Sequence, residues 1–298
     1  AMLAIAPDVI EAADPYRLGW AARRAAQQLG VPAVAFYHSD LARMAAVRAG
    51  VLGGRAAGLY VRALYDGYDR VLAPSRAMMA RLADLGVRRV GYQPLGVDLR
   101  RFHPRQRDLR LRRALGIGPQ VRLLVFAGRY APEKNIPRLL AMAARLGPAY
   151  HLLLIGPGMP ASAQRNVTVW SRYLRGRLPA VLASADAFVH AGDQETFGLV
   201  VLEAMASGVP VVGSPAGAVP ELIVPGTGMV AARCTADALA EAVDALFAAG
   251  APAAGRLARQ MVRQRWAWAQ VLPGLIEHYR ACMRPAPRGA YGPADAGA

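Results

Sequence analysis

Hydrophobic and polar positions follow two alternating patterns along this chain, and together they predict an α/β fold built on parallel sheets. Short apolar runs, bounded by glycine, proline or polar residues, predict strands. These runs cover residues 8–13, 34–38, 70–74, 121–127, 150–155, 167–170, 187–190, 209–213 and 229–231. Helical patterns fall at residues 54–68, 75–85, 108–115, from 136, 236–249 and 256–283. Because the two patterns alternate, we expect helices to cross between parallel strands.

A segment without periodicity divides the chain. Residues 94–104 carry turn residues and are predicted to be a linker. We expect a first domain at 1–100 and a second at 101–265, whose six strands make a complete Rossmann-like sheet. A terminal helix at 266–284 and a flexible Pro-, Gly- and Ala-rich tail at 285–298 follow. The first domain is expected to be incomplete, because the chain opens on a buried strand without a preceding helix or glycine-rich turn.

The charge of the chain favours anionic partners. Lys and Arg number 36 against 20 Asp and Glu, which gives a net charge of +16. Nucleic acid, lipid head groups and phosphorylated substrates are all compatible with this charge. The basic residues are spread over the whole chain, and no DNA- or RNA-binding motif accompanies them. We therefore expect no nucleic-acid partner, and keep such a function as an alternative that depends on charge alone.

Cysteine usage and hydropathy point to a reducing cytoplasm. Cys234 and Cys282 lie far apart with no His or Cys at metal spacing, so neither a disulfide framework nor a zinc site is predicted. No charged-then-apolar leader is present, and no apolar run approaches the ~18 residues of a membrane span.

Residues 193–210 set two carboxylates eight positions apart around a helix start. An apolar stripe from Phe197 onward predicts the helix, and we expect Thr196 to be its N-cap. Glu195 then lies on the preceding loop, while Glu203 lies inside the helix among apolar neighbours. A lone carboxylate in that environment needs a partner. The simpler alternative is an amphipathic helix with two solvated acids.

The start of this helix is a candidate phosphate site. The backbone N–H groups of Phe197, Gly198 and Leu199 would be free to bind an anion, and Gly198 would let the ligand approach closely. A ligand with phosphate at one end and hydroxyl groups at the other would satisfy both the helix start and the acids. A nucleotide sugar has this chemistry.

Two cations are predicted at a neighbouring strand end. The strand at 121–127 ends in Gly128 and Arg129, and a loop then leads to Glu133 and Lys134, the single lysine of the chain. Ligands of open α/β sheets bind at the carboxyl ends of the strands. Arg129 and Lys134 would suit a diphosphate leaving group. The alternative is a loop in which these cations form a salt bridge with Glu133.

The ordered set of motifs resembles retaining glycosyltransferases of family 4. Glu195-Thr-Phe-Gly through Glu203-Ala-Met-Ala-Ser-Gly-Val-Pro is similar to the E-x7-E signature of that family. Further similar blocks are 8–10, 36–40, 73–76, 95–98 with 102–104, 128–129 with 133–134, and 217–221, in the family's order from about residue 7 to 279. The resemblance implies a GT-B architecture of two Rossmann-like parallel-sheet domains, the first one incomplete here. It also implies that the terminal helix crosses back onto the first domain.

The resemblance assigns roles to these residues. It implies that Arg129 and Lys134 stabilise the diphosphate, and that Glu203 accepts the ribose hydroxyls. It further implies that Glu195 faces the donor sugar near its reacting carbon and that His38 reaches over the cleft to that sugar. Glu195 as a nucleophile and a front-side attack that needs no separate base both stay open.

Backbone positions complete the implied donor site. Gly128 and the turn at 217–221, which begins with Gly217, would line it; a plain strand-to-helix turn is the alternative for 217–221. Two departures from the family pattern are Asn135 and Ala218, where relatives carry glycine. Asn tolerates a left-handed backbone, whereas Ala218 could change its loop locally.

The implied activity is a retaining, metal-independent transfer of a hexose of the mannose or glucose type to a lipid or saccharide hydroxyl. No cofactor is expected, and the donor is a UDP- or GDP-sugar, with residues 170–173 near the base. Positive charge would hold the enzyme against an anionic membrane surface, peripheral to its cytoplasmic face. The alternative is a truncated, catalytically incomplete module that binds nucleotide sugars.

Overall fold

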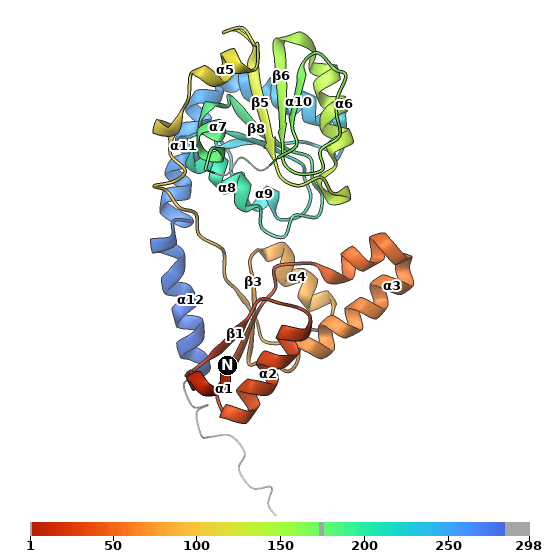
Figure 1. The fold of residues 1–298 in the computed structure, drawn as a ribbon, viewed down its shortest axis with the longest axis vertical. Coiled ribbons are helices and arrows are strands. Elements are labelled where there is room, and N and C mark those ends of the chain that lie inside the picture. The colour runs from red at the N-terminus through yellow and green to blue at the C-terminus, as the bar shows by residue number, and fades with distance from the viewer. Residues whose placement is uncertain (1, 173–175, 284–298) are drawn as a thin grey trace, which may run out of the picture.

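Two parallel sheets make up the computed structural model, which describes residues 2–172 and 176–283 (Figure 1). The predicted tail at 285–298 and Tyr173 of the predicted base-binding edge lie outside the described residues. The first sheet has the order β1-β2-β3-β4. Its strands are β1 (Ile10–Ala12), β2 (Ala33–Phe36), β3 (Arg70–Ala73) and β4 (Val90–Tyr92), and its helices are α1 (Met2–Ile5), α2 (Arg17–Leu29), α3 (Leu41–Tyr65) and α4 (Arg76–Asp84).

The second sheet contains the six strands that the apolar runs predict. Its order is β10-β9-β8-β5-β6-β7, and every pairing is parallel. The strands are β5 (Arg122–Ala127), β6 (Tyr150–Ile155), β7 (Val167–Trp170), β8 (Ala187–His190), β9 (Val211–Gly213) and β10 (Gly228–Val230). The helices are α5 (Arg110–Ala114), α6 (Ile136–Leu146), α7 (Leu178–Ser184), α8 (Leu199–Ala206), α9 (Val219–Leu222), α10 (Ala236–Ala249) and α11 (Ala251–Arg265). Short 3₁₀ turns lie at Pro104–Gln106, Pro132–Lys134 and Gly147–Ala149.

Several elements differ from the sequence predictions. The helix predicted at 54–68 is the second part of the longer α3, which kinks at Ala49 and Gly50 where the backbone leaves helical geometry. The predicted helical stretch 256–283 is divided, because α11 ends at Arg265 and α12 (Trp268–Met283) begins after a break. The patterns also missed α2, whose buried positions are the small residues Gly19, Ala22, Ala25 and Ala26, and β4, which has only 3 residues.

The chain crosses between the two sheets at two neighbouring points. Val97 in the linker donates its N–H to the carbonyl of Trp266 at 2.8 Å and forms a parallel bridge with Ala267. Gly96 is required beside them, because a Cβ there would lie 2.5 Å from the ring of Trp268. From this point α12 runs back along the first sheet (Figure 1). Its apolar residues pack on that sheet, and they are Leu275, Tyr279 and Cys282.

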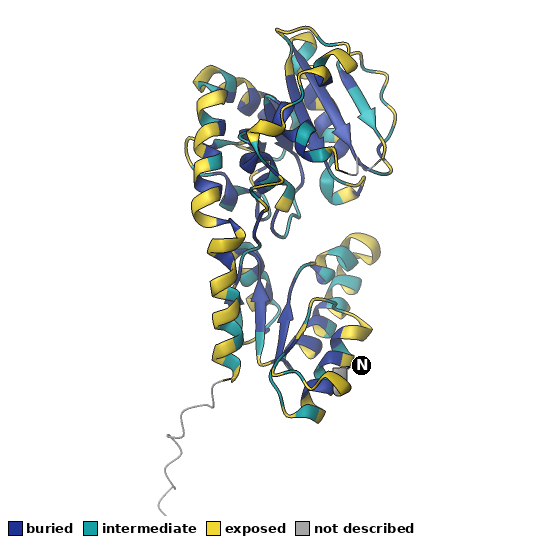
Figure 2. Cartoon of the chain, turned by 60° about the vertical axis from the view of Figure 1, so that its left-hand side comes forward, coloured by how far each residue is buried: buried dark blue, intermediate teal, exposed yellow. Residues whose placement is uncertain are grey.

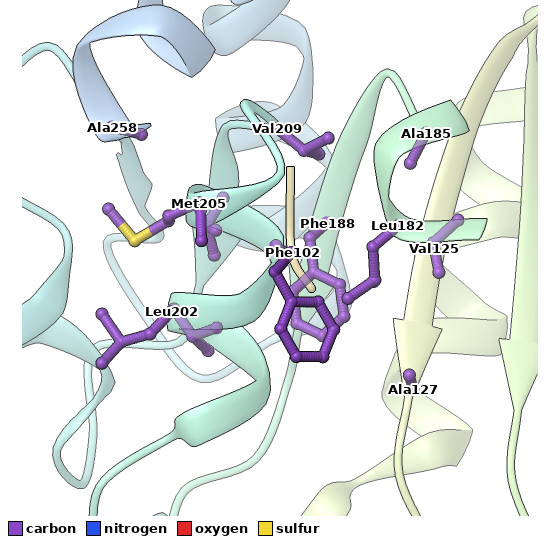
Figure 3. Close-up of a cluster of buried hydrophobic side chains, with 14 of the residues drawn as sticks. Phe102, Val125, Ala127, Leu182, Ala185, Phe188, Leu202, Met205, Val209 and Ala258 are labelled. Atoms are coloured by element: carbon purple, nitrogen blue, oxygen red, sulfur yellow. The ribbon is translucent and has the colours of Figure 1, made fainter. Parts of the chain in front are cut away.

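Burial separates the interior strands from the outward faces of the helices (Figure 2). The strands of both sheets are largely buried, and α12 presents an exposed face to solvent. One cluster of the second sheet's core surrounds α8: Leu202 and Met205 belong to it together with Phe102, Leu182 and Phe188 (Figure 3). Burial of each such side chain stabilises the folded state by roughly 1.5–3 kcal/mol. These contacts hold α8 against the sheet. This core positions the loop before α8, and it also positions Glu203 within the helix.

Candidate functional site

The carboxyl ends of β5 and β8 lie side by side, because these strands pair although β6 and β7 separate them in sequence. The loops that follow, 128–135 and 191–198, therefore meet at one edge of the sheet. Gly128 donates its N–H to the carbonyl of Ile155 at 2.9 Å. A Cβ at Gly156 would lie 1.8 Å from the carbonyl oxygen of Gly128, so glycine is required for this close approach.

Lys134 and Glu195 meet at this edge. The Nζ atom of Lys134 lies 2.5 Å from Oε2 of Glu195, and their side chains are only 18% and 15% exposed. The same oxygen lies 3.2 Å from Nε2 of His190, which is the last residue of β8 and is fully buried. Two donors, one from the end of β8 and one from the loop after β5, thus hold one carboxylate oxygen.

These contacts determine the charge of Glu195. Burial on its own raises the pKa of the carboxyl, but the hydrogen bond and charge of His190 and the ammonium of Lys134 outweigh it. The resulting pKa is about 2, compared with an ordinary value of 4.5. Glu195 is therefore an anion throughout the neutral range.

Arg129 also pairs with an acid. Its guanidinium contacts the Glu133 carboxylate, and its side chain is 55% exposed. The salt-bridged loop considered as an alternative is therefore present, although the acid that pairs with Lys134 is Glu195. Arg129 also lines a cavity of about 80 Å³ with Gln194 and with Arg48 from α3 of the first sheet. Cations from both halves of the chain thus face this cavity.

The start of α8 is left open for a ligand. The prediction that Thr196 is the N-cap is wrong. The N-cap is Gly198, which has a left-handed backbone at φ 92°. In the described part of the chain, the backbone N–H groups of Phe197, Gly198 and Leu199 donate no hydrogen bond. The Thr196 hydroxyl instead donates to the carbonyl of His38 at 3.0 Å. This tertiary contact displaces the local cap and leaves three N–H groups available.

Glu203 lies about one turn into α8, in a different environment. No hydrogen bond or ion pair reaches its carboxylate from the described residues, and the charge of Arg101 acts on it only from a distance. Burial raises its pKa to about 7, against the lowering effect of Arg101. The lone carboxylate expected from the sequence is therefore present, and it has no protein partner among the described residues.

His38 follows β2 and brings the first sheet to the site. Its ring stacks on Phe36 with centroids 4.3 Å apart, and burial lowers the pKa of the imidazole. Its carbonyl accepts the hydrogen bond from Thr196, the residue beside Glu195. Among the described residues the imidazole forms no hydrogen bond with Glu195, so the structure brings the two loops together and not the two side chains.

Further contacts between the sheets surround Glu195. Ser75, the N-cap of α4, donates its hydroxyl to the carbonyl of Thr196 at 2.8 Å. The carboxylate of Glu221 accepts the backbone N–H groups of Arg76 at 2.9 Å and Ala77 at 2.7 Å. An acid from α9 thus completes the cap of a helix that belongs to the other sheet.

The turn at 217–221 packs against the backbone of Glu195. Gly217 has φ +66°, and a Cβ there would lie 2.8 Å from the backbone nitrogen of Glu195. Ala218 donates its N–H to the Glu195 carbonyl at 2.9 Å and has φ −85°. The replacement of glycine by Ala218 therefore strains nothing. Asn135 adopts the left-handed conformation at φ 50°, as expected.

Sequence reasoning missed two residues of this site. No sequence pattern singled out His190, and Glu221 entered only as the last residue of the turn at 217–221. Each acts through a partner from another loop, so spacing along the chain gave no signal. One signal was available for His190: it ends a predicted strand, at the edge where ligands of α/β sheets bind.

Unpaired polar atoms gather at the same edge. Buried side-chain atoms without a hydrogen-bond partner include Nδ2 of Asn135, Nδ1 of His190 and Oδ1 of Asp193. Buried polar atoms are normally paired, so a set of unpaired ones is typical of a binding site. Among the described residues no three His, Cys, Asp or Glu side chains gather as a metal site, and no helix there is both long and apolar enough to cross a bilayer.

Two family models match the two halves of the chain. The model described as "Glycosyl transferases group 1" matches residues 108–263, and the one described as "Glycosyltransferase Family 4" matches residues 1–101. The chain belongs to the family 4 glycosyltransferases. The resemblance drawn from the sequence motifs is therefore confirmed, while the individual roles of the site residues stay predictions.

Relatives of this glycosyltransferase include three GDP-mannose-dependent alpha-mannosyltransferases. The protein of Mycolicibacterium smegmatis is 40% identical over 93% of this chain and 74% of its own length. That of Mycobacterium tuberculosis is 39% identical over 74% and 58%, and that of Corynebacterium glutamicum is 34% identical over 73% and 53%. The chain thus spans between about half and three quarters of the length of these relatives.

Solved structures of similar fold confirm the architecture. Sucrose-phosphate synthase from Thermosynechococcus elongatus has a TM-score of 0.76 at 24% identity, covering 92% of this chain and 73% of its own. Anabaena HepE in complex with UDP-glucose has a TM-score of 0.79 at 20% identity, covering 92% and 79%. The GT-B arrangement of two parallel-sheet domains, expected from the sequence, is confirmed by these likenesses.

Proposed function

We propose that this glycosyltransferase moves mannose from GDP-mannose to a hydroxyl group with retention of anomeric configuration. One observation carries the proposal: Lys134, Glu195 and the unpaired N–H groups at the start of α8 converge on one sheet edge. The choice of donor draws on the three GDP-mannose-dependent relatives, which are 34–40% identical to this chain. The fold likeness to a UDP-glucose complex supports a nucleotide sugar in general.

Each charged group of the site has a role in the proposed reaction. The diphosphate lies against the start of α8, where free N–H groups and the helix dipole favour an anion. Lys134 and Arg129 neutralise the charge that grows on the leaving phosphate. Glu195, an anion at neutral pH, faces the mannose, and Glu203 accepts the ribose hydroxyls. No metal is required for these steps, because protein cations and N–H donors stabilise the leaving group.

For the acceptor we propose a lipid-linked hydroxyl at an anionic membrane surface. Near its kink, α3 exposes apolar residues between arginines: Val47, Val51 and Leu52 are 56%, 70% and 78% exposed. Arg48 of the same segment lines the cavity beside Arg129. A related protein of Mycobacterium tuberculosis, 32% identical over 76% of this chain, is a phosphatidylinositol dimannoside mannosyltransferase. An apolar and basic tip beside the site suits a lipid acceptor.

The donor is tested by thermal shift and by transfer. A ligand that binds only the folded chain raises the melting temperature, so GDP-mannose should raise it more than UDP-glucose does. Lys134→Ala should reduce the shift, with a loss of GDP affinity of about 10–100-fold, the value of one or two charge-assisted contacts. Arg145→Ala, which removes a cation from a surface pair on α6, is the control and should leave GDP binding unchanged.

Transfer separates the enzyme from a binding module. Radiolabelled GDP-mannose with vesicles containing phosphatidylinositol-type lipids should yield a labelled lipid, and NMR of the product should show the α-anomer. Binding of GDP-mannose without transfer to lipid, saccharide or water would favour the catalytically incomplete module instead. Equal binding of UDP-glucose would overturn the choice of GDP-mannose, and no binding of either would overturn the function.

A further inference from the structure

His190 is a buried imidazole with one contact to the site. It is fully buried at the end of β8, and its ring lies 6.0 Å from that of Phe126. A Cβ at Gly192 would lie 2.6 Å from its Cε1 atom, so the ring is enclosed on that side as well. Its only hydrogen bond in the described structure joins Nε2 to Oε2 of Glu195. The ring therefore has little freedom to turn away from this oxygen.

The partner fixes the tautomer of His190. Glu195 is ionised, and an ionised carboxylate only accepts hydrogen bonds, so Nε2 carries the proton. The Nδ1 atom is buried and has no partner in the described structure. The structure thus presents His190 as a fixed Nε2–H donor.

Lys134 and His190 donate to the same oxygen, Oε2, and the described residues provide no partner for Oε1. If the diphosphate binds as proposed above, it competes with Glu195 for the Lys134 ammonium. Lys134 is at the end of a short turn and can redirect its flexible side chain. His190 is enclosed and cannot follow. The carboxylate then depends on His190 for its orientation at the moment when the sugar is bound.

We propose that His190 is a positioning residue, which holds Oε2 of Glu195 and leaves Oε1 free for the donor sugar while Lys134 engages the diphosphate. The inference rests on the proposed function. The role of His190 is to keep Glu195 in one rotamer after the Lys134 ammonium is shared with phosphate. Removing it should therefore lower kcat and leave GDP affinity nearly unchanged, because His190 touches neither phosphate nor base.

Two substitutions of similar size test this role. In His190→Gln the amide nitrogen reaches about as far as Nε2 and can still donate to Glu195. In His190→Asn the amide reaches only about as far as Nδ1. We expect His190→Asn to lower kcat about 10–100-fold, the effect of losing one hydrogen bond to a charge, while KM for GDP-mannose and Kd for GDP change less than about three-fold. His190→Gln should recover kcat to within about five-fold of the wild type.

Other outcomes contradict the proposal. Equal kcat in both variants and the wild type would show that His190 positions nothing. An equal loss in both, accompanied by a lower Tm and weaker GDP binding, would show a structural role only.

A second measurement is independent of turnover. In the full chain with ¹⁵N-labelled histidine, the His190 signals are identified by their loss in His190→Gln. They should show a proton on Nε2, and the Nε2 signal should shift in Glu195→Gln. A proton on Nδ1 in place of Nε2, or no response to Glu195→Gln, would overturn the proposal. If the wild type transfers no mannose, the proposed function fails, and this spectrum still decides whether His190 holds Glu195.

Discussion

Glu195 lies just before α8 and Glu203 lies within it. Burial affects both carboxyls, yet their pKa values differ widely. Burial raises the pKa of each. At Glu195 the donors His190 and Lys134 reverse that effect and bring the pKa to about 2. At Glu203 only the distant charge of Arg101 opposes burial, and the pKa stays at about 7. The comparison shows that burial raises the pKa of an acid here unless nearby donors and cations offset it.

The two acids therefore suit different tasks. A carboxylate with a pKa of about 2 keeps its charge throughout the neutral range, which suits the position proposed for Glu195 beside the reacting sugar carbon. A carboxyl with a pKa of about 7 and no partner gains most from a ligand that donates hydrogen bonds. The hydroxyls of a ribose are such donors, and binding them should release a proton near neutral pH.

The largest effect is expected for Glu195→Gln. We expect kcat with GDP-mannose to fall about 10³-fold, because an anion at the reacting centre is lost. GDP affinity should stay equal or rise, since Lys134 no longer pairs with the mutated side chain. Initial rates and isothermal titration measure both quantities. Glu241→Gln, which removes a surface acid on α10, is the control. A fall in kcat of less than ten-fold would contradict the role of Glu195.

The second effect depends on pH and concerns Glu203→Gln. Because the folded-state pKa is raised, ionisation of Glu203 costs stability, and this cost grows as pH rises from 4.5 to above 7. It amounts to at most about 3 kcal/mol above pH 7 and disappears below pH 4.5. Glu203→Gln should therefore raise Tm at pH 8 but not at pH 4. The same variant should bind GDP about ten-fold more weakly at pH 8.

The GDP titration decides between two explanations of that result. Wild-type affinity for GDP should increase as pH rises through 7, because the ligand prefers the ionised carboxylate, whereas Glu203→Gln should show no such increase. If both proteins respond equally to pH, another group is responsible.

The smallest effect is expected for Glu221→Ala. The N–H groups of Arg76 and Ala77 lose their acceptor, at a cost of about 1 kcal/mol. Because these bonds hold the first sheet against the loop of Glu195, kcat should fall a few-fold while the pH response of Glu203 is retained. Thr235→Ala removes the cap of α10 within the second sheet and is the matched control. A fall in kcat for Thr235→Ala as well would indicate general destabilisation.

Most of the fold could be predicted from the sequence because each of the six strands of the second sheet is a local apolar run. The pairing of Lys134 with Glu195 could not, since it needs β5 and β8 to be neighbours although two strands separate them in sequence. Thr196 shows the opposite case: its local pattern favours an N-cap, but a carbonyl from the first sheet takes its hydroxyl. Local preferences failed where the two sheets meet.

The paired crossings at Val97 and Trp266 have a mechanical consequence. Two hydrogen-bonded segments at one place resist sliding and twisting more than a single linker would. If one sheet rotates against the other, the axis would pass through this crossing. Loops far from that axis would sweep the widest arc, whereas those near it would hardly shift. Any such opening would have to break the hydrogen bonds of Thr196 with His38 and Ser75, whereas the contact of Val97 with Trp266 could stay in place.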